Sequence, residues 1–183
     1  MSHSFSKILT GLIVASLVGY LGVHMLDFLW GSNLVFALEN SYYAELSGDS
    51  EVLPVSTEAT GLATFEFSED NTQLSFTINV SAIDNVLGAH IHQGDESENG
   101  PVALTLYNGS DSPEGDISGT LTAGNATAPD LEGPLSGEDF SNLIGVINEG
   151  AAYVNVHTVD FPDGEIRGTI VNSSLLEVPS ISP

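Results

Sequence analysis

The chain has 183 residues, with 25 acidic residues against two Lys or Arg, and its formal net charge is −23. The length suits one domain plus a targeting segment, and the charge excludes nucleic acid and anionic lipid headgroups as partners because like charges repel. Without cysteine, the chain has no disulfide, thiolate nucleophile or zinc–thiolate site. We interpret the acidic surface as an adaptation to a salty exterior.

Residues 1–37 have the pattern of an export signal. Lys7 precedes an apolar run over 8–26 that has no formal charge, and Val35-Phe36-Ala37 offers a signal-peptidase site after Ala37. The run is also about long enough to span a bilayer, so an uncleaved membrane anchor is the alternative. We expect membrane contact only through this segment. Both interpretations predict an extracellular or cell-surface location.

From residue 41 to residue 172, apolar and polar residues mostly alternate, as in half-buried β-strands. Two alternating runs, 63–67 and 74–80, flank the polar tetrad 68–71 and predict a hairpin. Turn-forming clusters such as 124–133 separate the later predicted strands, which are Leu87–His92, Val102–Tyr107, Asp116–Leu121, Ala152–Thr158 and Glu165–Val171. This spacing predicts an all-β domain over 41–172, an antiparallel sandwich or barrel.

One short helix is predicted over about 136–148. Ser136 is the candidate N-cap, with acidic residues in the first turn, and Gly150 follows as a stop. An apolar face at helical spacing is formed by Phe140, Leu143, Ile144 and Ile147. We expect the helix to pack across one end of the sheet, and the tail 173–183, which contains two prolines, to be flexible.

Three of the five histidines lie in two of the predicted strands. In the first strand Ala89 and Ile91 face one way, so His90 and His92 share the opposite face. Two later strands carry similar polar stripes, which contain Tyr153, Asn155, His157, Glu165 and Arg167. Because the turn 161–164 joins these two strands, we expect a hairpin. We further expect the strand Ala152–Thr158 to lie beside or directly across from Leu87–His92, with His157 near the other two histidines.

Three converging imidazoles predict a site for copper or zinc. Side chains at i and i+2 lie roughly 7 Å apart along a strand, so His90 and His92 can share an ion only if a neighbouring strand supplies a third ligand. The alternative is a structural cluster, in which the histidines bond to Glu51, Glu165 or backbone groups and order the sheet.

Four further residues are expected to support the three ligands from outside the coordination sphere, namely Glu51, Asn155, Glu165 and Arg167. We expect Arg167 to pair with a carboxylate, either its same-face neighbour Glu165 or the more distant Glu51. The turn 95–100 resembles the first half of a calcium loop, but Leu106 stands at the twelfth position, so a solvated acidic turn is expected instead.

Six segments stand out along the chain, namely Leu46–Val55, Thr60–Ala63, Ala89–Gly94, Asn99–Val102, Tyr153–Thr158 and Pro162–Gly168. In this order they resemble the CHRD (chordin-type) domain family. The resemblance extends over the chain from about Tyr42 to Ile170, and Leu53 departs from the family, which often has a second proline there. The resemblance implies a β-sandwich in an extracellular protein. It does not imply growth-factor antagonism, which accompanies cysteine-rich modules that this chain lacks.

These observations predict a secreted or surface-anchored protein with a binding or structural role, whose extracellular partner the sequence does not identify. No catalytic residue is assigned. The alternative is a small extracytoplasmic copper- or zinc-dependent oxidoreductase, with the three histidines as ligands. Four Asn-x-Ser/Thr sequons stand at Asn79, Asn108, Asn125 and Asn172, and the second and third of them lie in predicted loops.

Overall fold

The computed structural model describes residues 40–109 and 115–175. The predicted signal or anchor segment, 1–37, lies outside the described residues. The first residues of the predicted tail form a short 3₁₀-helix, η4 (Ser173–Leu175), and the rest of the tail lies outside. Within the described ranges, no helix is long and apolar enough to cross a membrane.

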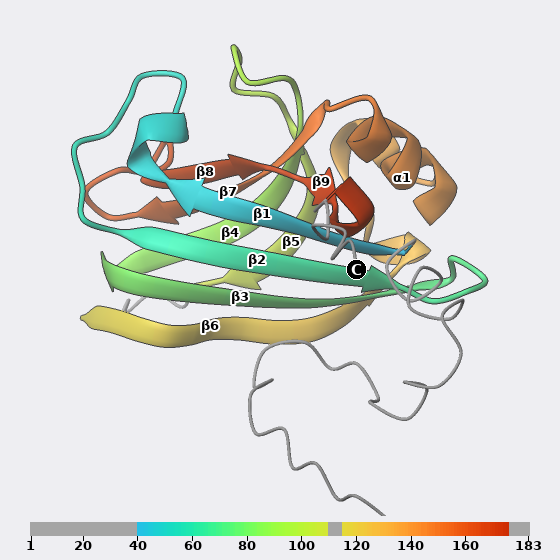
Figure 1. Cartoon of the computed structure of the whole chain (residues 1–183), viewed down its shortest axis with the longest axis horizontal. Helices are drawn as coiled ribbons and strands as arrows, with labels where there is room; N and C mark the ends of the chain where they lie inside the picture. The colour runs from blue at the N-terminus through green and yellow to red at the C-terminus, as the bar shows by residue number, and fades with distance from the viewer. Residues whose placement is uncertain (1–39, 110–114, 176–183) are drawn as a thin grey trace, which may run out of the picture. The chain divides into compact units, whose positions relative to one another are not determined.

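The described residues form one antiparallel sheet of nine strands, in the order β5-β4-β7-β8-β1-β2-β3-β6, with β9 paired to β1 (Figure 1). The strands are β1 (Ser41–Ser47), β2 (Thr60–Phe67), β3 (Gln73–Asp84), β4 (Val86–Gln93), β5 (Val102–Asn108), β6 (Asp116–Thr127), β7 (Ala152–Thr158), β8 (Ile166–Thr169) and β9 (Val171–Asn172). The other elements are η1 (Gly48–Ser50), η2 (Ala128–Asp130), η3 (Gly133–Leu135) and the helix α1 (Phe140–Asn148).

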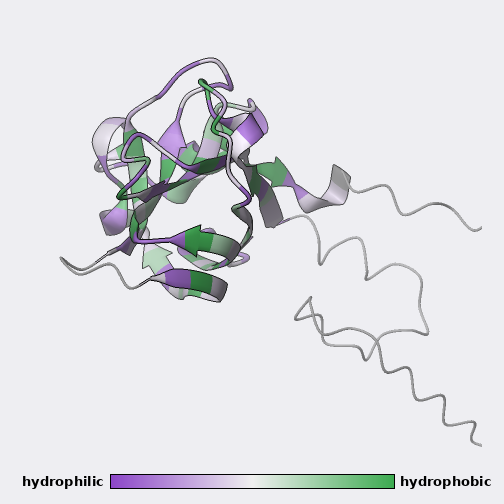
Figure 2. Cartoon of the chain, turned by 90° about the vertical axis from the view of Figure 1, so that its left-hand side faces the viewer, coloured by the Kyte–Doolittle hydropathy of each residue, from purple (hydrophilic) through white to green (hydrophobic). Residues whose placement is uncertain are grey.

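The sheet curls into a nearly closed barrel around a core built from every strand except the short β9, which confirms the predicted fold class. Figure 2 shows hydrophobic and hydrophilic residues alternating along the strands. The segment after β6 helps to close the gap between the edge strands, because Leu131 bridges to Leu104 of β5 and the Glu132 amide donates to the Ala103 carbonyl (2.8 Å). Closure of this kind leaves little free sheet edge.

The predicted hairpin is confirmed as β2–β3, with Phe65 opposite Phe76 and Ala63 opposite Ile78. Other strands differ from the prediction in their limits or number. The strand β6 continues to Thr127 instead of stopping near 121, because its partner β3 offers pairing down to Gln73. The strand predicted over 165–171 divides into β8 and β9, which pair with different neighbours. The strand β1 was not assigned from the sequence.

The predicted helix exists but begins later than expected. Its N-cap is Asp139, whose carboxylate accepts a hydrogen bond from the Ser141 amide (2.9 Å), and not Ser136. A 3₁₀-turn, η3, occupies the preceding residues. At the other end Gly150, with φ 73°, donates to the Ile147 carbonyl, and Ala151 donates to that of Val146. This pair of bonds is a Schellman motif, so the predicted stop is confirmed.

The charge distribution predicts that salt stabilises the domain. Arg167 is the single Lys or Arg in the described part, and it is only 1% exposed. The surface carboxylates there therefore repel one another without a Lys or Arg side chain between them. Raising NaCl from 0.01 M to 1 M shortens the Debye length from about 30 Å to about 3 Å. We expect the melting temperature to rise by about 5 °C, measured by calorimetry at pH 7.

The same salt series near pH 4 is the control, because many carboxylates are then protonated and less repulsion remains to be screened. An equal rise at both pH values would contradict the electrostatic explanation.

Candidate metal centre

The three polar stripes lie on adjacent strands, as predicted. The strand β7 pairs with β4 on one side and with β8 on the other. Register places Asn155 between His90 and Arg167, and Tyr153 directly across from His92. The expected β7–β8 hairpin and the expected neighbourhood of β4 and β7 are both confirmed.

The three histidines converge on one point. One ring nitrogen from each of His90, His92 and His157 lies within 4.8 Å of the other two. The ring centroids are 5.1 Å apart for His90 and His157, 5.6 Å for His92 and His157, and 5.7 Å for His90 and His92. This spacing is compatible with three ligands around one ion.

Backbone carbonyls orient two of the rings. Nδ1 of His92 lies 2.8 Å from the Gly100 carbonyl, and Nδ1 of His157 lies 3.1 Å from the Pro162 carbonyl. A carbonyl can only accept, so both Nδ1 atoms carry the proton and both Nε2 atoms keep a free lone pair. Buried ring nitrogens without a hydrogen-bond partner are Nε2 of His92, Nε2 of His157 and Nδ1 of His90. Metal-bound histidines are held in this way, with the second ring nitrogen donating to a carbonyl.

Local irregularities of the sheet surround the cluster. The β4–β5 register shifts between Ala89 and His90 and again between Ile91 and His92. The β4–β7 register shifts between Val86 and Gly88, just before the pair that Gly88 forms with His157. Bulges increase the local twist and re-aim side chains, and they are common beside functional sites.

Gly88 provides room for the His90 ring. A Cβ at this position would lie 3.0 Å from Cε1 and 3.3 Å from Nε2 of that ring. Gly88 pairs directly with His157, so the His90 ring leans over the glycine toward the third ligand. Any larger residue would push the ring away from this position.

Burial lowers the pKa of all three histidines below its usual value, and the neighbouring imidazoles lower it further. The cause is that a charged imidazolium is poorly solvated in the partly closed site and repels its neighbours. The Arg167 guanidinium adds to this effect at His92. The rings are therefore neutral at pH 7, which is the form that binds metal ions.

Arg167 does not form the predicted pair with a carboxylate. Within the described residues its guanidinium donates to the backbone carbonyls of Asp95 (2.6 Å) and Glu98 (3.0 Å) and to Oδ1 of Asn99 (3.2 Å). Its Cζ also lies 3.3 Å from the centroid of the Tyr153 ring. The turn 95–100 is therefore wrapped around an arginine, which explains its acidic, carbonyl-presenting form better than a calcium loop does.

Glu165 instead accepts hydrogen bonds from two threonines, Thr57 and Thr158, each at 2.7 Å. These bonds tie the segment after η1 to the end of β7. Glu165 is 7% exposed, and its carboxylate is satisfied by hydroxyl groups rather than by a cation. The structure thus shows Glu165 as a brace between loops, on the same side of the sheet as the histidines.

Glu51 and Asn155 meet beside Gly164. Both side chains are buried, and Oε1 of Glu51 and Oδ1 of Asn155 have no hydrogen-bond partner. Gly164 has φ 133°, and a Cβ there would collide with both groups, 2.6 Å from Oε1 of Glu51. Burial raises the pKa of Glu51 to about 7, against the opposing effects of the Arg167 charge and the Asn155 amide. A protonated Glu51 has the hydroxyl that an acceptor such as Oδ1 of Asn155 requires.

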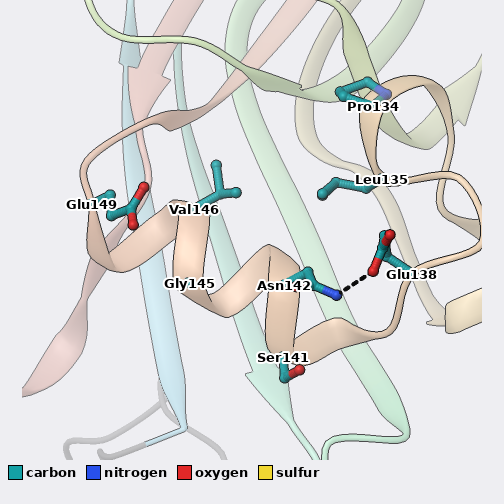
Figure 3. Close-up of a pocket in the computed structure, with 8 residues that line it drawn as sticks. All are labelled: Pro134, Leu135, Glu138, Ser141, Asn142, Gly145, Val146 and Glu149. Carbon is teal, nitrogen blue, oxygen red and sulfur yellow. Dashed lines mark hydrogen bonds between the residues drawn. The ribbon is translucent and has the colours of Figure 1, made fainter.

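A separate shallow pocket of about 390 Å³ lies along α1 and η3. Figure 3 shows Glu138 and Glu149 on its wall, with Asn142 donating to Glu138 (2.7 Å). Its lining contains no histidine, and Leu135 and Val146 supply its apolar part. The candidate metal ligands therefore lie in the histidine cluster and not in this pocket.

Sequence reasoning missed several contributors to the cluster. The carbonyls of Gly100 and Pro162 and the space at Gly88 depend on loop geometry and bulges, which strand alternation does not report. Tyr153 was placed on the polar stripe but not in the site. It stacks on His92, with centroids 5.0 Å apart and planes at 7°. The available signal was its place on the same strand face as Asn155 and His157.

The sequence matches the CHRD domain family over residues 42–170, which is more than half of the chain. No match was found among curated proteins or among solved structures. The matched range contains all three histidines and the residues around them.

The raised pKa of Glu51 predicts a pH-dependent effect of Glu51→Gln. The unfolded chain ionises this group above about pH 4.5, whereas the folded protein keeps it protonated to about pH 7, so the wild type loses stability across this interval. Glutamine has no such cost. We expect the variant to be more stable relative to wild type at pH 8 than at pH 4.5, seen as a larger relative free energy of unfolding in urea denaturation.

Glu66→Gln, at an exposed position of β2, is the control for loss of a single negative charge. A relative stability of Glu51→Gln that does not change between the two pH values, or changes as it does for Glu66→Gln, would contradict the burial argument.

Proposed function

The chain belongs to the CHRD domain family, and we propose that it is an exported metal-binding protein. His90, His92 and His157 bind one copper or zinc ion, and the domain performs its binding role outside the cell. The observation that carries the proposal is the convergence of three histidines from two strands, with one ring nitrogen of each within 4.8 Å of the others and an unpartnered buried nitrogen on every ring.

The donor set indicates the class of metal. Three neutral imidazoles are borderline donors, which suit copper and zinc, whereas calcium and magnesium prefer oxygen ligands. Among the described residues, the group of side chains whose ligand atoms lie within 4.8 Å of one another consists of the three histidines and includes no carboxylate. Three protein ligands leave a further position for water or an exogenous ligand.

Closing the cluster around an ion requires small movements. If all three nitrogens were 4.8 Å apart, the centre of their triangle would lie about 2.8 Å from each. A Zn–N bond is about 2.0 Å long, so each nitrogen moves by about 0.8 Å or less. Small side-chain rotations supply such a shift without changing the strands.

Two features support the exported location. The N-terminal segment has the charge and apolar run of an export signal, and the family resemblance implies an extracellular protein. Cell fractionation tests this part of the proposal, and a full-length product confined to the cytosol would contradict it.

The burial of Arg167 bears on the oxidoreductase alternative. Its guanidinium is bound to the turn 95–100, so the described domain presents no Lys or Arg side chain to guide an anionic substrate toward the cluster. The observation favours a metal-binding role over catalysis on anions.

Removing one ligand tests the site. We expect His92→Ala to weaken copper and zinc binding at least tenfold, because two imidazoles hold the ion less tightly than three. The measurement is competition titration with a metal chelator on the full chain. Replacing His3 and His24 by Ala in every sample leaves the cluster as the only source of imidazole.

If wild-type protein in this background binds neither ion more tightly than His92→Ala does, the histidines form a structural cluster and the metal proposal is wrong.

Gly88→Ala tests the geometry without removing a ligand. The added methyl group would lie 3.0 Å from Cε1 of His90 and 3.3 Å from the Tyr107 carbonyl oxygen, so the ring must shift from its present position. We expect metal affinity to fall about tenfold, a typical effect of disturbing the support of a ligand. The matched control is Gly145→Ala in α1, where the new Cβ meets nothing within 4 Å and affinity should not change. Equal affinities in both variants would contradict the proposed position of His90.

A further inference from the structure

The turn 95–100 is held by one side chain from a distant part of the sequence. Arg167 of β8 reaches across β7 and donates to the carbonyls of Asp95 and Glu98 and to Oδ1 of Asn99. It is 1% exposed and lies against the face of the Tyr153 ring. A guanidinium buried in this way fixes the positions of its acceptors, because each of them compensates for the water that it has lost.

Gly100, which ends this turn, contacts the histidine cluster directly. The Gly100 carbonyl accepts from Nδ1 of His92 (2.8 Å), and the Gly100 amide donates to the Tyr153 hydroxyl (2.9 Å). The position of Gly100 therefore decides which nitrogen of His92 carries the proton. It also decides whether Nε2 points to the other two histidines.

Tyr153 lies between Arg167 and His92 and contacts both. Its ring contacts the Arg167 guanidinium and stacks on the His92 imidazole. Arg167, Tyr153 and His92 thus form a continuous contact from β8 through β7 to β4, and the turn closes over them. Both the plane and the rotation of the His92 ring are fixed by groups that Arg167 holds.

We propose that Arg167 is the positioning residue of the metal centre. It fixes the turn 95–100 so that His92 stays in its Nδ1–H form with Nε2 free for the ion. The inference rests on the proposed metal site for its effect on affinity, but its effect on His92 is independent of metal.

An arginine is needed because its acceptors are spread over several residues. The planar fork donates through two separate nitrogens to Asp95, Glu98 and Asn99. Lysine keeps the charge but has one compact ammonium group, so it cannot reproduce this fork. The comparison between Arg167→Lys and Arg167→Met therefore separates geometry from charge.

The first experiment uses the metal-free protein. Long-range proton–nitrogen correlation spectra at pH 8 identify which ring nitrogen of His92 is protonated. We expect the Nδ1–H form in wild type and a mixture of both forms in Arg167→Met and Arg167→Lys. Asn99→Ala removes one acceptor on the exposed turn without removing the buried charge, and it should give a smaller change in the same direction.

The second experiment measures copper and zinc affinity by competition titration in the same background without His3 and His24. Both Arg167 variants should bind about 10- to 100-fold more weakly, the usual range when a partner of a ligand is lost, and Asn99→Ala about threefold more weakly. The control is Ile78→Val in β3, a buried position on a strand that pairs with β2 and β6 rather than with β4 or β7, which lowers stability without removing a group that contacts the turn.

The outcomes separate the two proposals. If Arg167→Lys keeps the wild-type tautomer and affinity, charge alone matters and the positioning role is wrong. Wild-type tautomer and affinity in both Asn99→Ala and Arg167→Met, with a stability loss like that of Ile78→Val, would also overturn it. If the tautomer shifts but wild type binds neither ion, the metal proposal fails and the positioning of His92 by Arg167 stands.

Discussion

The burial of one guanidinium is the constraint on which the polar face of the sheet depends. A charge removed from water must be compensated, and Arg167 has no carboxylate partner within the described residues. Two carbonyls and an amide oxygen from a distant turn, together with the Tyr153 ring, supply that compensation. The turn is therefore bound to the sheet, and the face that would otherwise be open to solvent is covered.

Coverage on both sides explains the unusual composition of β4, β7 and β8. Their apolar residues face the barrel core, while their polar residues lie under the turn 95–100 and the loops near Glu51 and Glu165. Each buried polar atom without a partner costs about 1–3 kcal/mol. Three imidazole nitrogens on one face share this condition, whereas a protonated Glu51 can donate to Oδ1 of Asn155. Three such nitrogens together are unfavourable for a purely structural cluster, and the proposed ion would remove the cost.

Strand phase was sufficient to predict the convergence of the histidines. The alternation around Ala89 and Ile91 assigned His90 and His92 to one face, and the short turn between β7 and β8 made their pairing the natural result. The fold class followed from the same alternation. The local sequence pattern did not predict the limits of elements that are set by contacts with other parts of the chain. The end of β6 is set by β3, and the start of α1 is set by the Asp139 cap after a 3₁₀-turn.

The partner of Arg167 was predicted wrongly for a physical reason. A sequence shows charges but not backbone carbonyls, so Glu165 and Glu51 were the natural candidates in so acidic a chain. The structure satisfies Glu165 with hydroxyl groups and raises the pKa of Glu51 to about 7 by burial. In the described domain the acidic surface and the neutral donor set are thus separate. The surface attracts cations of every kind, whereas the proposed site of three imidazoles would select among them by donor chemistry. An acidic exterior is therefore compatible with a site that discriminates against hard cations.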